Sequence, residues 1–296
     1  MISNLSGKGR SLLILSKAFS LGISLLCPAT SAEAPSPPPI ESPSRTAPSQ
    51  SPIAELNTGP RTRLRGNWVG RQPVSPSLKI VVMAGHADSQ GMHGSGTPGA
   101  AVDQRGEAPM DPRMRDELFW NQKVRDAVVA LSKQKGLNII GYDPGTLSIA
   151  KASDPRTNWS VAHRLSRQGD YILEIHFDAY SPHGYGSGLI PALNRNLNRV
   201  DESLAQSFGR FPRFFRGGLG GPRRGISILE IGMLEGSLEA NLRNPKTREA
   251  TIQAIALKVT DALMLGVRGK TSSNPPPGVV DNAPPTSNPQ TNSEVE

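Results

Sequence analysis

Three short apolar runs along the chain each end in a residue that can bind a metal or carry a proton. They are rich in β-branched side chains, and their length is typical of buried strands. The runs cover residues 79–86, 171–176 and 226–230. The residues that end them are His86, His176 and Glu230. Because ligands gather at the carboxyl ends of strands in open α/β sheets, we expect these three side chains to share one sheet edge.

A helix is expected between the first two runs. Apolar residues return at helical spacing over about residues 113–135, at Trp120, Val124, Val128 and Leu131. Glu117 and Asn121 fall on the same stripe. A buried carboxylate is costly without a partner. A bound cation would supply that partner, and so would the positive end of the helix dipole. Both interpretations of Glu117 stay open from the pattern alone.

The remaining pattern alternates strands with helices. A strand is expected at 137–140, and helices at about 157–168, 200–209 and 246–266. The Gly-rich segment 85–111 is expected to be a loop, and no Gly-Lys-Ser/Thr ends it as a phosphate-binding loop would require. This alternation predicts an α/β fold, with a mainly parallel twisted sheet and helices on both faces of a single domain.

The first residues are typical of an export signal. Lys8 and Arg10 give a basic start, residues 12–26 are mostly apolar, and small residues offer cleavage after Ala32 or Ala34. The apolar stretch is too short for a membrane span. We therefore expect a periplasmic or extracellular protein with no stable membrane insertion after signal cleavage, the alternative being an uncleaved anchor.

Two further segments lack any apolar periodicity. One is rich in Pro, Ser, Arg and Thr, and the other in Pro, Asn, Ser and Thr. Neither can bury enough surface to offset its ordering entropy. We therefore divide the chain into a signal peptide, a disordered linker, a folded domain and a disordered tail, at residues 1–33, 34–75, 76–269 and 270–296.

The net charge of the 296-residue chain is +8. A positive protein suits an acidic polymer, such as a cell wall or a nucleic acid. Nucleic-acid-binding motifs are missing from the sequence, and aromatic residues make up only 5% of it. We therefore expect an anionic cell envelope as the partner and no nucleic acid.

Two imidazoles and one carboxylate make an open zinc site, and a second carboxylate can activate water there. In this chain the candidates follow the order strand-His, helix-Glu, strand-His, strand-Glu. That order resembles the zinc-dependent N-acetylmuramoyl-L-alanine amidases of the amidase-3 family, over about residues 79–266. The matching segments are Gly85-His86, Glu117 with Asn121, Ile175-His176, and Leu229-Glu230-Ile231-Gly232.

The resemblance implies an exported peptidoglycan hydrolase that cuts the amide between N-acetylmuramic acid and L-alanine. His86, Glu117 and His176 would bind Zn²⁺, and Glu230 would be the catalytic carboxylate that moves the proton of a zinc-activated water. Any protein activator stays unidentified. Two alternatives remain: a non-catalytic cell-wall-binding module of the same fold, and a zinc carboxypeptidase. The latter class places His and Glu close together, whereas no His-x-x-Glu occurs around His86.

The chain departs from the family pattern near the expected ligands. The gap from His86 to Glu117 is long, which leaves Glu107 as a rival ligand, although no predicted helix holds it. Glu174 stands where the family has Ser, and could orient a ligand or be an ordinary satisfied polar residue. Asp178 stands where the family has Asn.

Other polar residues are weaker candidates. His93, His163 and His183 could bind a metal but match no family position. Arg223 and Arg224 precede the strand of Glu230 and could bind a peptide carboxylate bidentately. The alternative for these arginines is a solvated basic loop.

Overall fold

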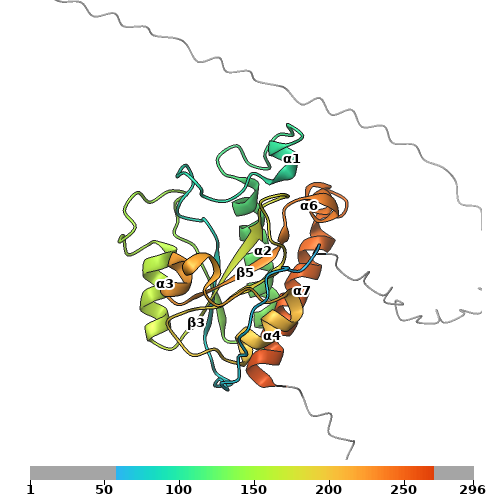
Figure 1. Cartoon of the computed structure of the whole chain (residues 1–296). Coiled ribbons are helices and arrows are strands. Elements are labelled where there is room, and N and C mark those ends of the chain that lie inside the picture. The colour runs from blue at the N-terminus through green and yellow to red at the C-terminus, as the bar shows by residue number, and fades with distance from the viewer. Residues whose placement is uncertain (1–57, 270–296) are drawn as a thin grey trace, which may run out of the picture. The chain divides into compact units, whose positions relative to one another are not determined.

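A five-stranded sheet forms the centre of the molecule (Figure 1). The computed structural model describes residues 58–269; the expected signal peptide, the linker up to residue 57 and the tail lie outside the described residues. The strand order is β2-β1-β3-β5-β4, parallel except for β4, which runs antiparallel to β5. The strands are β1 (Ile80–Ala84), β2 (Ile139–Tyr142), β3 (Tyr171–Asp178), β4 (Gly188–Ile190) and β5 (Ile226–Met233).

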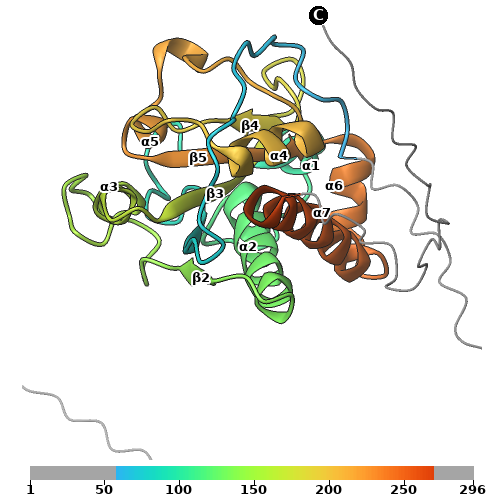
Figure 2. The ribbon, with the colours of Figure 1, turned by 90° about the horizontal axis from the view of Figure 1, so that it is seen from below.

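Helices cover both faces of this sheet, so the predicted α/β fold is confirmed (Figure 2). The helices are α1 (Gly99–Asp103), α2 (Asp116–Gln134), α3 (Asn158–Arg167), α4 (Arg199–Phe208), α5 (Gly220–Arg223), α6 (Gly236–Arg243) and α7 (Arg248–Arg268), with a 3₁₀ turn at Phe215–Gly217. Helices α2, α4 and α7 pack together on one face, and α3 and α5 lie on the other. The sequence pattern did not indicate β4, α1, α5 or α6, which are short.

Side-chain alternation along β3 separates the two faces. Tyr171, Leu173, Ile175 and Phe177 join the large core under α2, α4 and α7. The intervening Ile172 joins a smaller core with residues of α3 and β5. Further along the strand, this second series continues with Glu174, His176 and Asp178. The apolar core therefore ends on that face where the polar residues begin.

Helix α7 is the long apolar element of the described chain. Its length and mean hydropathy of 1.4 would also fit a membrane-crossing helix. In the structure, however, its apolar positions Ile252, Ile255, Val259 and Leu263 are buried in the large core against α2 and α4. This is the environment of a core helix in a folded domain.

Residues 58–75 pack on the domain, which corrects the expected linker boundary. Trp68 is 6% exposed, and its indole Nε1 donates to the Phe211 carbonyl at 2.7 Å. The backbone of Arg61 forms an isolated β-bridge with Ser187, next to β4. The prediction failed because one buried tryptophan among Pro, Ser and Arg creates no periodic pattern. The expectation of disorder is therefore wrong for residues 58–75.

Candidate active site

The first histidine lies just beyond β1. His86 has φ 63°, a left-handed conformation that few non-glycine residues adopt. The preceding Gly85 is held by Asn121, whose Nδ2 donates to the Gly85 carbonyl at 3.1 Å. A Cβ at Gly85 would lie 2.3 Å from the His176 ring. Glycine is therefore required for the two imidazoles to approach to a centroid distance of 4.8 Å.

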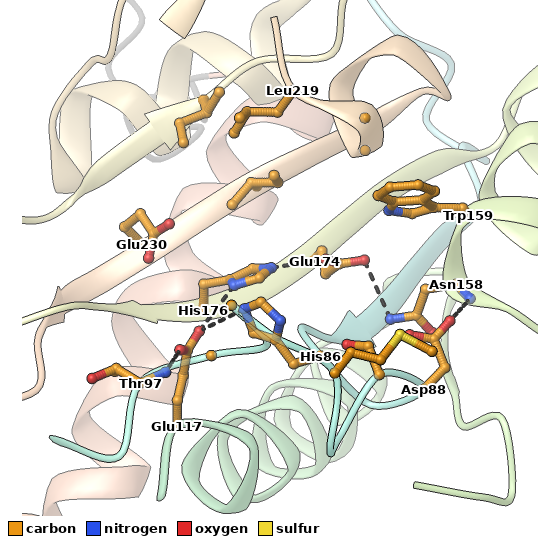
Figure 3. Close-up of a pocket in the computed structure, with 18 of the residues that line it drawn as sticks. His86, Asp88, Thr97, Glu117, Asn158, Trp159, Glu174, His176, Leu219 and Glu230 are labelled. Atoms are coloured by element: carbon orange, nitrogen blue, oxygen red, sulfur yellow. Dashed lines mark hydrogen bonds and ion pairs between the residues drawn. The ribbon is translucent and has the colours of Figure 1, made fainter. Parts of the chain in front are cut away.

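Glu117 joins the two histidines from the first turn of α2 (Figure 3). Its Oε1 lies 3.4 Å from His86 Nε2 and 3.0 Å from His176 Nδ1. Its Oε2 accepts from the Thr97 backbone N–H at 2.7 Å. Burial alone would raise the pKa of Glu117, but the His86 and His176 imidazoles outweigh that effect and hold the pKa below its usual range. Glu117 thus contacts the two histidines and a neighbouring loop, and its place in the first turn of α2 is also where the helix dipole stabilises a carboxylate.

These three side chains fit a metal ion. One ligand atom each from His86, Glu117 and His176 lies within 4.8 Å of the others. Ligands about 2.1 Å from a tetrahedral zinc stand about 3.4 Å apart. The separations from Glu117 to the two histidines are close to that value. Two neutral imidazoles and one carboxylate would also leave a position open.

Glu174 contacts the second histidine directly. His176 Nε2 lies 2.8 Å from Glu174 Oε1. Glu174 Oε2 accepts from Asn158 Nδ2 at 3.3 Å, and the same amide group donates to the Ala84 carbonyl at 2.8 Å. A carboxylate on the far nitrogen orients an imidazole and fixes which nitrogen is free to bind a metal. Of the two interpretations of Glu174, the contact favours the orienting one, with Nδ1 directed to Glu117.

Glu230 reaches the same site from β5, where it is the register partner of His176. Its Oε2 is buried and has no hydrogen-bond partner among the described residues. Burial raises the pKa of Glu230 to about 8, with the nearby His176 opposing the shift and the Asp178 and Glu117 carboxylates adding to it. A buried, unpartnered carboxyl beside a group that could hold a metal has the chemistry of a general acid or base.

Asp178 has a different role. Its carboxylate accepts from the backbone N–H groups of Ala179 at 2.8 Å and Gly186 at 2.9 Å, and also from that of Tyr185. These bonds close the loop after β3. Asp178 therefore shapes the wall of the site, and its oxygens are occupied by the loop.

The rival ligands lie elsewhere. The Glu107 side chain is 46% exposed and pairs with Arg105 and Arg243. The three remaining histidine candidates, His93, His163 and His183, are exposed. Among the described residues, only His86, Glu117 and His176 form a group that could hold a metal.

A cavity of about 560 Å³ opens over the four central residues. Its far end is lined by apolar side chains that include Trp159, Phe215 and Leu219, and Figure 3 shows Trp159 across the site from Glu117. This asymmetric lining gives the cavity one polar end and one apolar end.

The arginines expected to bind substrate do not line this cavity. Arg223 donates to the carbonyls of Gly217 and Gly218. Arg224 donates to the Gly220 carbonyl and stacks on Trp159 at 4.4 Å. Arg216 lines the cavity in their place. It belongs to the same Arg- and Gly-rich segment, and nothing in the sequence pattern distinguished it.

Comparisons with known proteins gave structural likeness only. No family model matches the chain, and no curated protein matches its sequence. The solved structures similar to it include the catalytic domain of the CD27L endolysin targeting Clostridia difficile, with 14% identity, 63% of this chain and 97% of that chain covered, and a TM-score of 0.43. Another is the catalytic domain of CwlV, an N-acetylmuramoyl-L-alanine amidase from Bacillus (Paenibacillus) polymyxa var. colistinus, with 17% identity, 65% and 100% covered, and a TM-score of 0.43. A third is the CwlD amidase from Clostridioides difficile in complex with the GerS lipoprotein, with 15% identity, 64% and 98% covered, and a TM-score of 0.43. The structural neighbours are thus N-acetylmuramoyl-L-alanine amidase catalytic domains at low sequence identity.

Proposed function

We propose that the protein is an exported zinc-dependent peptidoglycan amidase that hydrolyses the bond between N-acetylmuramic acid and L-alanine. The observation that carries the proposal is the convergence of His86, Glu117 and His176 on one point, with Glu230 facing them from the next strand. The substrate class follows from the order of these residues along the chain, which resembles that of the amidase-3 family.

His86 Nε2, Glu117 Oε1 and His176 Nδ1 would hold the metal ion. A zinc ion held there would supply Lewis acidity to the amide carbonyl and lower the pKa of a water molecule. The buried contact between His176 Nε2 and Glu174 keeps the imidazole in one orientation while Nδ1 binds. Asn158 in turn fixes the Glu174 carboxylate.

Glu230 transfers the proton in this reaction. As water adds to the carbonyl carbon, Glu230 takes one proton from it. When the carbon–nitrogen bond breaks, Glu230 returns that proton to the departing nitrogen, so that the L-alanine amine is released and the lactyl group ends as a carboxylate. Because Oε2 has no partner among the described residues, no hydrogen bond must break before this exchange begins.

Export is part of the proposal because the substrate lies outside the cytoplasm. The basic and apolar start of the chain, before the small residues around Ala32, would direct it there. Mass spectrometry of the secreted or periplasmic protein would give its first residue. An amino terminus beyond residue 32 is expected, and a full-length chain retained in the cytoplasm would contradict export.

The full chain tests the function directly. Metal analysis should find one zinc per chain, and digestion of purified peptidoglycan should release peptides that begin with a free L-alanine amine and leave the glycan strands uncut. Shortened peptides still attached to muramic acid would mean a carboxypeptidase. Binding to the wall without release of any peptide would mean a binding module.

A further inference from the structure

The charges lining the cavity are strongly uneven. Five carboxylates line it around the metal-binding residues: Asp88, Glu117, Glu174, Asp178 and Glu230. Among the described lining residues, Arg216 is the one lysine or arginine. Apart from the charge of a bound metal, these carboxylates would repel an anionic group of a substrate, and Arg216 would attract it.

Arg216 is held in position by aromatic rings. Its guanidinium carbon lies 5.1 Å from the centre of the Phe215 ring and 5.2 Å from that of Tyr185. These two rings contact each other edge to face at 5.3 Å, and Phe215 packs in turn on the buried Phe211. Stacking orients a guanidinium and leaves the donors on its edge free.

The backbone at Arg216 is also unusual. Its φ of 51° and ψ of 37° lie in the left-handed region, which costs a non-glycine residue about 1 kcal/mol. Glycines occupy the next two positions, 217 and 218. Such strain is often found where a residue is held for function. Here it presents the arginine side chain to the cavity.

Three other arginines of this segment are bonded to the protein, and Arg213, which also lacks a hydrogen-bond partner among the described residues, does not line the cavity. Arg210 donates to Glu202 and to the Trp68 carbonyl. Arg223 and Arg224 donate to backbone carbonyls of their own loop. Arg216 makes no hydrogen bond or ion pair within residues 58–269. Its donors are therefore available to a ligand.

Resting on the proposed function, we propose that Arg216 binds a free carboxylate on the peptide side of the scissile amide. On the glycan side, the lactyl carboxyl is consumed in that amide and carries no charge. On the peptide side, the second stem residue is a γ-linked glutamate whose α-carboxylate is free or amidated. A guanidinium edge pairs bidentately with a carboxylate and loses that pairing with a carboxamide. Arg216 thus selects stems whose second residue keeps its carboxylate.

The test uses two soluble muropeptides that differ only at the second stem residue, one with the free carboxylate and one with the carboxamide. The wild-type full chain should favour the carboxylate by roughly 10–100-fold in kcat/KM, the range expected for a charge-assisted hydrogen bond. Arg216→Met should bring the carboxylate substrate down to the level of the carboxamide, whose own kcat/KM stays near the wild-type value. Arg216→Lys, which keeps the charge without the fork, should retain part of the preference.

Arg164→Met is the matched control, because that exposed arginine of α3 does not line the cavity; its preference should equal that of the wild type. Zinc content and melting temperature are measured for every variant. Equal cleavage of both substrates by the wild type, or an equal loss on both in a folded, zinc-loaded Arg216→Met, would overturn the role of Arg216 and leave the proposed function intact. A wild-type chain that cleaves neither would overturn the proposed function, and this inference with it.

Discussion

The two faces of the sheet are made by the same strands, but one face forms the apolar core and the other carries the candidate site. The face under α2, α4 and α7, here called the core face, receives Leu173 and Ile175 from β3 and Leu229 and Ile231 from β5, all of them buried. The opposite face, under α3 and α5, is here called the cavity face. Along β3 and β5 its apolar residues, Ile172, Ile226 and Ile228, come before the polar ones.

The difference shows how one alternating pattern can separate stability from chemistry. Toward the carboxyl ends of the strands, the cavity face replaces apolar residues with Glu174, His176 and Glu230, which burial alone would disfavour. The core face compensates with the large apolar cluster beneath α2, α4 and α7. Substitutions on the two faces should therefore have opposite effects. A change on the cavity face should lower activity, and a change on the core face should lower stability.

The largest expected effect lies on the cavity face. Glu230→Gln should lower kcat by about 10²–10⁴-fold, because the amide keeps the size of the side chain but cannot take the proton. Zinc content and melting temperature should stay close to wild type. Steady-state kinetics on a muropeptide, with metal analysis of the same sample, measure both. Near-normal turnover by a zinc-loaded variant would remove Glu230 from the mechanism.

A core-face position on the adjacent strand β3 should show the reverse. Leu173→Ala should lower the free energy of unfolding by about 2–5 kcal/mol through lost burial and a residual cavity, since the side chain is fully buried. Turnover per folded molecule should not change. Denaturant unfolding gives the stability, and Leu173→Met, which conserves volume, is the control with a smaller loss. A folded Leu173→Ala protein with impaired turnover would show that the two faces are coupled.

A smaller effect is expected for the residue that orients the metal ligand. Glu174→Ser, which removes the carboxylate from His176 Nε2, should weaken zinc binding by about 10–100-fold in chelator competition. Glu174→Gln should recover part of the affinity, because its carbonyl still accepts from His176 Nε2. Asp88→Asn removes a neighbouring negative charge without touching His176. An equal loss in that control would assign the effect to net charge and not to orientation.

The smallest effect belongs to the rival ligand. Glu107→Gln should leave zinc stoichiometry and turnover unchanged, because Glu107 pairs with Arg105 and Arg243 at the surface, away from the three metal-binding residues. Metal analysis beside Glu117→Gln, which should lose zinc, compares the two carboxylates in one experiment. Zinc loss from Glu107→Gln would reverse the assignment.

The sequence predicted those parts of the site that depend on periodicity. Strand runs that end in His86, His176 and Glu230 bring these residues to one edge because parallel strands share a direction. The helical stripe was enough to raise Glu117 above Glu107. These predictions needed only local pattern and the general geometry of parallel sheets.

The remaining parts depend on contacts between distant segments. Arg216 acquires its position from Tyr185 and from a left-handed backbone, neither of which leaves a repeat in the sequence. Trp68 is buried only because the Phe211 carbonyl and the surrounding core are present. The role of Glu174 required the distance to His176 Nε2, since alternation alone placed the two residues on one face without a bond between them.

The segment before β1 has a consequence for self-association. Strand β4 lies at the end of the sheet, where an unpaired backbone would offer a template for another chain. Beside it, the Ser187 N–H donates to the Pro60 carbonyl at 3.0 Å, and the Thr62 N–H donates to the Ser187 carbonyl at 2.9 Å. The protein's own chain thus occupies the position that an aggregating neighbour would take. Leu189 of β4 pairs in the same way with residues 209–211, so shortening the chain past Thr62 would uncover only the Ser187 end of this edge, and the damage would be seen as oligomers and precipitate before it was seen in the catalytic rate.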